Sequence, residues 1–286
     1  MNFTKLQGLG NDFVLVDGRE VPKADWADLA RRICAPHFGV GSDGLLVLLT
    51  SRTADFRMRM FNPDGSEAEA CGNGLRCLVR YIEAKKLNSR SNLLIETMAG
   101  VRQAELIKRE SRVALIKVSM GKPSFRPESL PVAVEAGKGG VFDIMTGDYP
   151  LAVGDQDLKL DFVSMGNPHA VYFTSIPVSK FPLATLGPNV DGNPLFPHGV
   201  NFEVVFMTGS DSCEMRVWER GAGETLACGS GACAVMVAAR MRGLTGDTIK
   251  INLPGGVAEV SWNGQDEVWL TGPAEIVFTG EWPNSL

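Results

Sequence analysis

Two cysteines stand at the start of similar glycine-rich motifs: Cys71 opens Cys-Gly-Asn-Gly and Cys228 opens Cys-Gly-Ser-Gly. Each motif leads into an apolar stretch that predicts a helix, over 71–86 and 228–242, so each thiol is expected at a helix N-terminus. Unpaired N–H groups and the positive end of the helix dipole stabilise a thiolate there and lower the thiol pKa. A thiolate so placed can remove a proton from carbon, and a thiol in the matching place can return one.

An internal repeat places the two cysteines in equivalent positions. Around the predicted helices the halves align at an offset of 157 residues, which matches Met58, Arg59, Phe61, Glu67 and Gly74 to Met215, Arg216, Trp218, Glu224 and Gly231. A second block aligns at an offset of 156, where Gly10-Asn11 meets Gly166-Asn167. Duplication alone indicates only a shared fold. A cysteine at the same turn in both copies favours a shared function.

Hydrophobic patterning predicts a chain rich in strands with one long helix in each half. In the first half, strands are expected at 3–6, 12–17, 44–49, 56–61, 92–98, 101–107 and 113–120, and helices at 25–34 and 71–86. In the second half, strands are expected at 158–165, 170–173, 201–207, 213–218, 248–253, 257–262, 267–271 and 274–278, and helices at 181–186 and 228–242.

The length of 286 residues predicts two domains. We expect one domain, which carries Cys71, over 1–122 plus 273–286, and a second, which carries Cys228, over 123–272. The glycine-rich stretch around 135–147 is longer than a simple crossover requires, and the sequence gives no function for it. A composition of 44% apolar and 21% charged residues is typical of a folded globular protein.

Charge and hydropathy exclude two classes of partner. The net charge is −5 and no run of lysine and arginine concentrates positive charge, so no nucleic-acid partner is expected. No apolar stretch approaches the roughly 18 residues that a membrane span needs, and the N-terminus lacks the apolar core of a signal peptide. These features predict a cytoplasmic protein with no membrane partner.

The remaining cysteines are expected in the core as free thiols. Cys77 and Cys233 lie six and five residues beyond the first cysteine of their motifs, so neither shares its helix face. Cys34 and Cys213 are most simply small apolar residues. Closely spaced Cys-x-x-Cys or Cys/His ligand pairs are absent from the sequence, so no metal site is predicted.

Two thiols related by pseudo-twofold symmetry would lie on opposite faces of one bound α-carbon. The glycines after each cysteine let a carboxylate approach the backbone N–H groups of the helix ends. Those dipoles would stabilise the carbanion that forms when the α-proton leaves. The expected chemistry is therefore inversion at the α-carbon of an amino acid, with neither a metal nor pyridoxal as cofactor.

Five motifs in order resemble the diaminopimelate epimerase family. They are Gly8-Leu9-Gly10-Asn11-Asp12-Phe13, Asn62-Pro63-Asp64-Gly65-Ser66-Glu67 running into 71–74, Gly166-Asn167-Pro168-His169, Gly199-Val200-Asn201-Phe202, and Trp218-Glu219-Arg220-Gly221 running to 228–231. The resemblance implies conversion of LL-diaminopimelate to its meso isomer, which supplies lysine and peptidoglycan synthesis. It also implies an α+β fold of two pseudo-symmetric domains, each a curved, mainly antiparallel, barrel-like sheet around a central helix, assembled as a homodimer.

The resemblance also assigns roles to individual residues. Cys71 and Cys228 match the two acid/base residues, and His169 and Glu219 match groups that tune the ionisation of the cysteines. By themselves His169 would be read as a core histidine and Glu219 as a surface acid. The substrate ligands implied are Asn11, Asn62, Gly72, Asn73, Asn167, Asn201, Glu219, Arg220, Gly229 and Ser230. Gly44 departs from the family, since some members carry a glutamine there that contacts substrate.

Two alternatives stay open at this point. A proline-racemase-like enzyme shares the two-thiol logic, but it typically has Cys-Gly-His-Gly at the first cysteine, where this chain has Asn73. A redox-sensing protein would instead join the two thiols as a disulfide. The full set of ligand-like residues argues against that second alternative.

Overall fold

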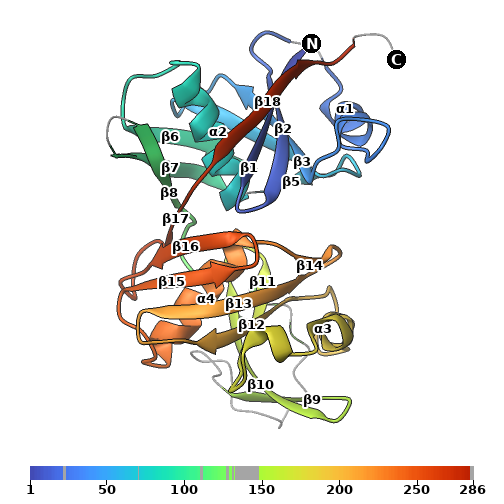
Figure 1. Cartoon of the computed structure of the whole chain (residues 1–286), viewed down its shortest axis with the longest axis vertical. Helices are drawn as coiled ribbons and strands as arrows, with labels where there is room; N and C mark the ends of the chain where they lie inside the picture. The colour runs from blue at the N-terminus through green and yellow to red at the C-terminus, as the bar shows by residue number, and fades with distance from the viewer. Residues whose placement is uncertain are drawn as a thin grey trace. The chain divides into compact units, whose positions relative to one another are not determined.

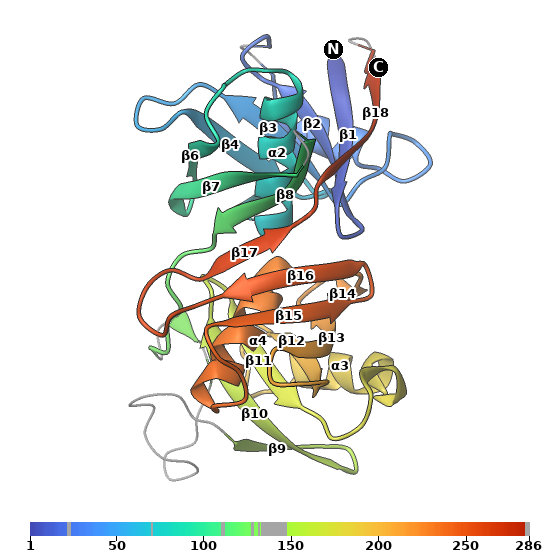
Figure 2. The same ribbon diagram turned by 60° about the vertical axis from the view of Figure 1, so that its left-hand side comes forward.

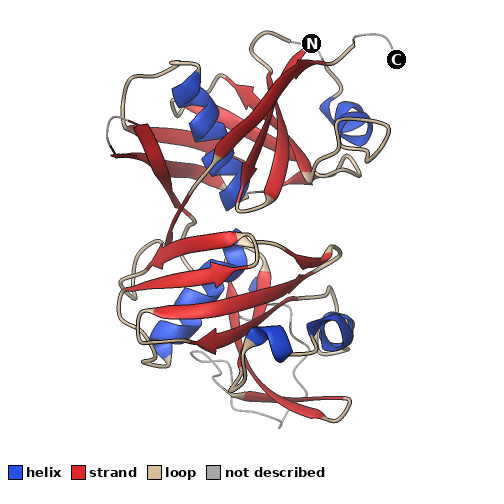
Figure 3. Ribbon diagram, in the orientation of Figure 1, coloured by secondary structure: helices blue, strands red, loops and turns tan. Residues whose placement is uncertain are grey.

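The computed structural model describes residues 1–21, 24–69, 71–109, 112–126, 129–130, 132 and 148–283. Within it the chain divides into two compact units: unit 1 is Met1–Ser119 with Thr271–Leu286, and unit 2 is Met120–Leu270. Strands far outnumber helices in both units (Figure 3). The α+β class predicted from the sequence is therefore confirmed. The glycine-rich stretch around 135–147 lies outside the described residues.

Unit 1 is one curved sheet with two helices. Its elements are β1 (Asn2–Gly8), β2 (Asn11–Asp17), α1 (Trp26–Ile33), β3 (Gly44–Leu49), β4 (Phe56–Phe61), β5 (Glu67–Ala68), α2 (Gly72–Ala84), β6 (Asn92–Thr97), β7 (Gly100–Arg109), β8 (Arg112–Ser119) and β18 (Glu275–Glu281). Pairing runs from β18 through β1, β2 and β3 to β4, which pairs with both β5 and β6, and then through β7 to β8. Among these pairings of described residues, β2–β3 and β4–β6 are parallel and the others are antiparallel.

Helix α2 is the central element of unit 1. It contacts β1, β2, β3, β4, β7, β8 and β18, and Figures 1 and 2 show the sheet bending around it. A helix covered on so many sides must be apolar around most of its surface. Leu75, Cys77, Leu78, Val79 and Ile82 supply that surface and are all buried.

Unit 2 repeats this plan. Its elements are β9 (Tyr149–Val153), β10 (Gln156–Ser164), β11 (Pro168–Phe173), η2 (Val178–Lys180), α3 (Leu183–Asp191), β12 (Asn201–Met207), β13 (Ser212–Glu219), β14 (Gly223–Thr225), α4 (Gly229–Met241), β15 (Thr248–Leu253), β16 (Gly256–Ser261) and β17 (Trp269–Gly272), whose last residues enter unit 1. Helix α4 contacts β10, β11, β12, β15 and β16, as α2 does the strands of its own unit.

The two units share one connectivity. In unit 2, β10–β11 and β12–β13 are antiparallel while β11–β12 and β13–β15 are parallel, which copies β1–β2, β3–β4, β2–β3 and β4–β6. The register agrees with the sequence offset: Leu48 pairs with Met58 as Val205 pairs with Met215. The expected curved, mainly antiparallel sheet around a central helix is present in each unit. The sheet curves around the helices, and the pairings among the described residues do not close it into a ring.

Three short strands and one helix boundary differ from the sequence prediction. Strands β5, β9 and β14 are too short or too irregular in pattern to be predicted from alternation. Helix α3 was expected to stop at Leu186 because Gly187 and Pro188 follow. It continues to Asp191 and packs against β13, where the Trp218 ring lies so close to Gly187 that a Cβ there would be 2.6 Å from it. Tertiary packing thus overrides a local breaker signal.

Cys34, Cys77, Cys213 and Cys233 are buried and form no disulfide, as predicted. No helix in the described part of the chain is long and apolar enough to cross a membrane.

Candidate active site

Cys71 is the N-cap residue of α2. Its backbone is extended, and its sulfur accepts a hydrogen bond from the Gly74 N–H at 3.4 Å. This is the place that serine or aspartate commonly takes at a helix start, so the thiol uses one of the unpaired N–H groups there. The side chain is partly exposed. A ligand can therefore reach the sulfur and the helix N-terminus together.

A chain of amide side chains lies beside Cys71. The Asn73 Nδ2 donates to Asn11 Oδ1 at 3.1 Å, and the Asn11 Nδ2 donates to Asp43 Oδ2 at 2.7 Å. Behind Asn73 the fully buried Arg76 donates from Nη2 to Asn73 Oδ1 at 2.8 Å. The Cys71 sulfur is 3.9 Å from Asn11 Oδ1, so this oxygen faces the thiol. Three of the residues proposed from sequence thus gather in unit 1.

Asn62 lies in the turn after β4. Its Nδ2 donates to Ser66 Oγ at 2.9 Å, and its backbone N–H donates to the Ser66 carbonyl at 2.8 Å. No hydrogen bond among the described residues joins its side chain to Asn11 or Asn73. Asn62 is therefore held by its own turn.

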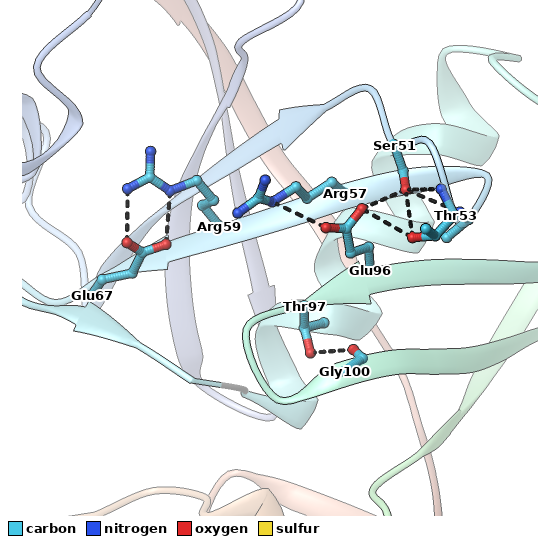
Figure 4. A network of polar contacts seen from close by, with 9 residues as sticks. Ser51, Thr53, Arg57, Arg59, Glu67, Glu96, Thr97 and Gly100 are labelled. Carbon is cyan, nitrogen blue, oxygen red and sulfur yellow. Dashed lines mark hydrogen bonds and ion pairs between the residues drawn. The ribbon is translucent and has the colours of Figure 1, made fainter.

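An ion pair holds the hairpin that leads to each cysteine. The Arg59 guanidinium donates from Nε and Nη2 to the two oxygens of Glu67, each at 2.7 Å, across strands β4 and β5 (Figure 4). In unit 2 the Arg216 guanidinium repeats the pattern on Glu224 at 2.7 and 2.9 Å. Such two-point pairs fix orientation as well as distance. Each hairpin therefore enters its helix at a defined angle.

Cys228 occupies the same position on α4. Its sulfur accepts from the Gly231 N–H at 3.4 Å and lies 3.5 Å from the Ser230 hydroxyl. Unlike Cys71 it is buried, with 5% of its surface exposed. Burial raises the pKa of the Cys228 thiol well above its ordinary value, and the nearby Glu219 and Glu203 carboxylates raise it further. Burial and the two carboxylates therefore favour the protonated thiol of Cys228 over its thiolate.

His169 lies on β11 and is fully buried. Its Nδ1 is 2.7 Å from Glu203 Oε1 on the parallel strand β12, and its Nε2 is 3.0 Å from Asn167 Oδ1. Asn167 in turn donates from Nδ2 to Ser230 Oγ at 3.4 Å. Desolvation raises the pKa of Glu203, and the charge and hydrogen bond of His169 lower it in part. His169, Asn167 and Ser230 are thus parts of one network that reaches Cys228.

A second group lies at the end of β13. The Arg220 N–H donates to Asn201 Oδ1 at 3.0 Å, and the Asn201 Nδ2 donates to the Pro168 carbonyl at 3.1 Å. The Arg220 side chain is exposed, with Nη1 3.3 Å from the His198 carbonyl. Glu219 accepts from the Thr225 hydroxyl at 2.5 Å. Asn201 is therefore a positioned residue, while the Arg220 guanidinium is open to a ligand.

The register explains the departure at Gly44. Gly44 pairs with Phe13 on the parallel strands of unit 1, where Asn201 pairs with His169 in unit 2. A Cβ at Gly44 would lie 3.0 Å from the Phe61 carbonyl oxygen. Unit 1 therefore has no side chain where unit 2 has Asn201.

Three residues beside these networks were not singled out from the sequence: Glu203, Arg76 and Asp43. Glu203 had a signal, because it interrupts the apolar strand Asn201–Met207 at a position whose repeat counterpart is Leu46. Arg76 likewise matches Cys233 in the repeat. A charged residue in one copy that aligns with an apolar residue in the other indicates a role that only one copy has.

At each helix start, residues 72–73 and 229–230 follow the cysteine in the first turn. The N–H groups of a first turn have no carbonyl one turn earlier in the helix to bind. Such groups bind carboxylates and phosphates well. Thiol, N–H donors and amide side chains together can hold an anion next to a group that moves a proton. Among the described residues no group of three or more His, Cys, Asp and Glu side chains is arranged to hold a metal ion.

Solved structures with similar folds include a phenazine biosynthesis protein of the PhzF family from Bacillus anthracis. Its TM-score is 0.71 at 17% identity, and the match covers 99% of both chains. A probable proline racemase from Agrobacterium radiobacter has a TM-score of 0.71 at 16% identity, covering 99% of this chain and 93% of that one. At these identities the likeness concerns the fold.

Sequence comparison is more specific. The chain is 44% identical to the diaminopimelate epimerase of Halothermothrix orenii over 283 residues, which cover 98% of this chain and 97% of that protein. It is 44% identical to that of Moorella thermoacetica over 286 residues, 99% of each. The family model described as diaminopimelate epimerase matches residues 3–126 and 162–277. With matches over nearly its whole length, the chain belongs to the diaminopimelate epimerase family.

Proposed function

We propose that the chain converts LL-diaminopimelate to meso-diaminopimelate by moving a proton at one α-carbon, with Cys71 and Cys228 as the two acid/base groups. Membership of the family makes the chain an isomerase. The observation that carries the mechanism is that two units of equal connectivity each use a cysteine as the N-cap of the central helix.

The reaction needs one base and one acid. A thiolate at one sulfur takes the α-proton, and the electron pair stays on the α-carbon and its carboxylate. The thiol at the other sulfur then gives its proton to the opposite face, so the configuration inverts and the two sulfurs exchange their charge. In the reverse direction the roles of Cys71 and Cys228 exchange.

The carbanion is the costly species, because an α-proton of an amino acid is very weakly acidic. We propose that the N–H groups of residues 72–73 and 229–230 hold the reacting carboxylate, where they stabilise charge as it develops. Asn11, Asn62, Asn167 and Asn201 would hold the remaining polar groups of the substrate. Arg220 would bind the second carboxylate with two parallel hydrogen bonds.

Glu219 and His169 are proposed to tune the cysteines. Burial and the Glu219 carboxylate raise the pKa of Cys228. This supports a free enzyme in which Cys228 holds the proton that is to be delivered. Transfer in this direction then begins at Cys71.

The remaining expectations from the sequence are carried as proposals. We propose domains at 1–122 plus 273–286 and at 123–272, a homodimer, and a place in lysine and peptidoglycan precursor synthesis. The reaction as proposed uses no cofactor.

The test is proton exchange in deuterated water. Incubation of LL-diaminopimelate with the purified chain, without added cofactor, should give the meso isomer with one deuterium at the inverted α-carbon. Mass spectrometry and chiral chromatography measure both. L-Proline in the same assay tests the racemase alternative, and exchange into proline but not into diaminopimelate would reject the proposed substrate.

Single variants test the mechanism. Cys71→Ala and Cys228→Ala should each stop epimerisation, because either change removes one of the two proton carriers. The control is Cys77→Ala, which removes a core thiol of α2 and should leave the mechanism intact. A fully active Cys71→Ala or Cys228→Ala enzyme would refute the two-thiol proposal.

A further inference from the structure

Glu203 and His169 form a buried acid–base pair that unit 1 lacks. The Nδ1 of His169 lies 2.7 Å from Glu203 Oε1, and both side chains are fully buried. By register their counterparts in unit 1 are Leu46 and Phe13, which are apolar and also buried. A charged pair in a core costs desolvation free energy that an apolar pair does not. Its presence therefore suggests a purpose that an apolar pair could not serve.

The pair is the inner end of a hydrogen-bond chain that ends at Cys228. From Glu203 the contacts run to His169 at 2.7 Å and to Asn167 at 3.0 Å. They continue to the Ser230 hydroxyl at 3.4 Å and to the Cys228 sulfur at 3.5 Å. All five residues belong to unit 2. Glu203 is also close to the helix start itself, since a Cβ on Gly231 would be 2.6 Å from its Oε1.

The donor and acceptor atoms of these groups give the chain of hydrogen bonds a direction. A carboxylate at Glu203 only accepts, so His169 Nδ1 must carry a hydrogen. The other ring nitrogen faces Asn167 Oδ1, which also only accepts, so the hydrogen of that contact lies on His169 Nε2. Because the Asn167 side-chain oxygen points toward the His169 ring, its amide nitrogen points toward Ser230 and donates to the Ser230 hydroxyl oxygen. The Ser230 hydrogen is then left for the Cys228 sulfur.

We propose that Glu203 is a positioning residue, which through His169 sets the direction of the hydrogen bonds that end at Cys228. With the chain in this direction, the Ser230 hydroxyl donates to the sulfur and stabilises the thiolate that Cys228 becomes after delivering its proton. If the hydrogen bonds ran in the opposite direction, the Ser230 hydroxyl would point a lone pair at the sulfur and would not stabilise a thiolate.

A purely electrostatic role of Glu203 and a role in setting the hydrogen-bond direction predict opposite changes in the Cys228 pKa for Glu203→Gln. The charged groups that act on Cys228 are Glu219 and Glu203, and His169 acts in turn on Glu203. If Glu203 acted only as a nearby negative charge, its removal would lower the pKa of Cys228. In the proposed role a neutral glutamine accepts from His169 Nδ1, and Nε2 then has no hydrogen to offer to Asn167. Asn167 then turns its amide nitrogen to the ring, and Ser230 donates to Asn167 instead of to sulfur.

The experiment is a titration of Cys228 by the ultraviolet absorbance of its thiolate in full-length Cys71→Ser protein. The matching Cys71→Ser, Cys228→Ser protein is subtracted as background. Burial also raises the pKa of Cys34, Cys77 and Cys213, and the background protein carries the same three thiols, so the subtraction removes their signal. We expect Glu203→Gln to raise the Cys228 pKa by about one unit, about tenfold less thiolate at a pH below it, as the loss of a hydrogen bond to a charged group implies. A lower or unchanged pKa would overturn the proposal.

Two further variants separate direction from loosened packing. Ser230→Ala removes the last link, so it should raise the Cys228 pKa by itself, and adding Glu203→Gln should raise it no further. Asp161→Asn is the matched control, because Asp161 is a buried acid of the same unit that binds Arg242 at the other end of α4. It should leave the Cys228 pKa in place. A rise equal to that of Glu203→Gln would assign the effect to packing and overturn the proposal.

If Glu203→Gln does not fold, the double variant His169→Phe, Glu203→Leu replaces it. This variant installs the residue types that unit 1 carries at Phe13 and Leu46, so the core keeps an apolar pair of a kind that the fold already accommodates. The same rise in the Cys228 pKa is expected. The role of Glu203 rests on the proposed function, in which Cys228 exchanges a proton. The titration measures the Cys228 pKa without turnover. An inactive enzyme would therefore show in the activity assay, and a misassigned Glu203 would show in the titration.

Discussion

The two cysteines share one backbone position but differ in their surroundings. Each sulfur accepts an N–H from the third residue beyond it, Gly74 for Cys71 and Gly231 for Cys228. Cys71 is partly exposed and faces the Asn11 side-chain oxygen, whereas Cys228 is buried near two carboxylates. Burial and negative charge both favour the neutral thiol. The repeat therefore fixes where the sulfurs are, and the neighbouring residues set their ionisation.

Arg220 should matter for binding more than for proton transfer. Its guanidinium is exposed and makes one long contact, to the His198 carbonyl. Arg220→Ala should therefore raise KM for diaminopimelate by roughly 10- to 100-fold, the loss expected for hydrogen bonds between charged groups, with a smaller change in kcat. Steady-state kinetics measures both.

His198→Ala is the control for Arg220. It removes an exposed ring but keeps the backbone carbonyl that Arg220 contacts, so both constants should stay close to those of the parent. If Arg220→Ala lowered kcat tenfold while KM stayed unchanged, Arg220 would instead act on the transition state alone.

At the scale of elements, the entry into each central helix is defined by a hairpin and its ion pair. Strands β4 and β5 are joined by Arg59 and Glu67, and β13 and β14 by Arg216 and Glu224. The guanidinium of Arg216 does more than its counterpart, because its Nη1 also donates to the carbonyls of Val178 at 2.8 Å and Phe181 at 3.0 Å. Arg216 thus ties the hairpin to η2 and the chain beside it.

This difference predicts unequal costs for the same substitution. Arg216→Lys loses the two-point pair and the hydrogen bonds to the carbonyls of Val178 and Phe181. Arg59→Lys loses the pair and the stacking of the guanidinium on the Phe61 ring, whose centroid is 4.7 Å away, but no such backbone hydrogen bonds. We expect Arg216→Lys to lower the free energy of unfolding by about 1–2 kcal/mol more, at about 1 kcal/mol for each extra hydrogen bond. Urea unfolding of both variants measures it. Equal losses would show that the bonds to η2 contribute nothing to stability.

At the scale of the whole molecule, the repeated connectivity does not extend to the buried charges. Unit 1 buries the Arg76 cation where unit 2 has Cys233, and unit 2 buries Glu203 and His169 where unit 1 has apolar side chains. Buried charges are costly, so a duplicated fold has no need to gain them for stability. These differences indicate that the two halves have diverged around their sulfurs.

The proposed mechanism needs both sulfurs beside one carbon, which predicts sensitivity to oxidants. Mild oxidation should join Cys71 to Cys228 and abolish epimerisation, and a reducing agent should restore it, because exchange through a thiolate is reversible. Peptide mass spectrometry identifies the cross-link. Cys71→Ser protein, treated in the same way, should give no such peptide. Full activity after complete oxidation would count against opposed thiols.

The sequence by itself determined much of this protein. Alternation and helical periodicity place most strands and both central helices, and the repeat shows that Cys71 and Cys228 are equivalent. These features are local or follow from a fixed offset, so no knowledge of packing is needed to see them. The motifs also point to the family, to which the chain belongs.

Only the tertiary structure decided how the side chains around each sulfur are connected. Glu203 and His169 are 34 residues apart and meet because β11 and β12 are parallel neighbours. Helix α3 passes through Gly187 and Pro188, and Trp218 from another strand packs on it at Gly187. Contacts between distant residues depend on strand pairing and on what else fills the core, which composition and spacing do not encode. The buried network behind Cys228 is such a case.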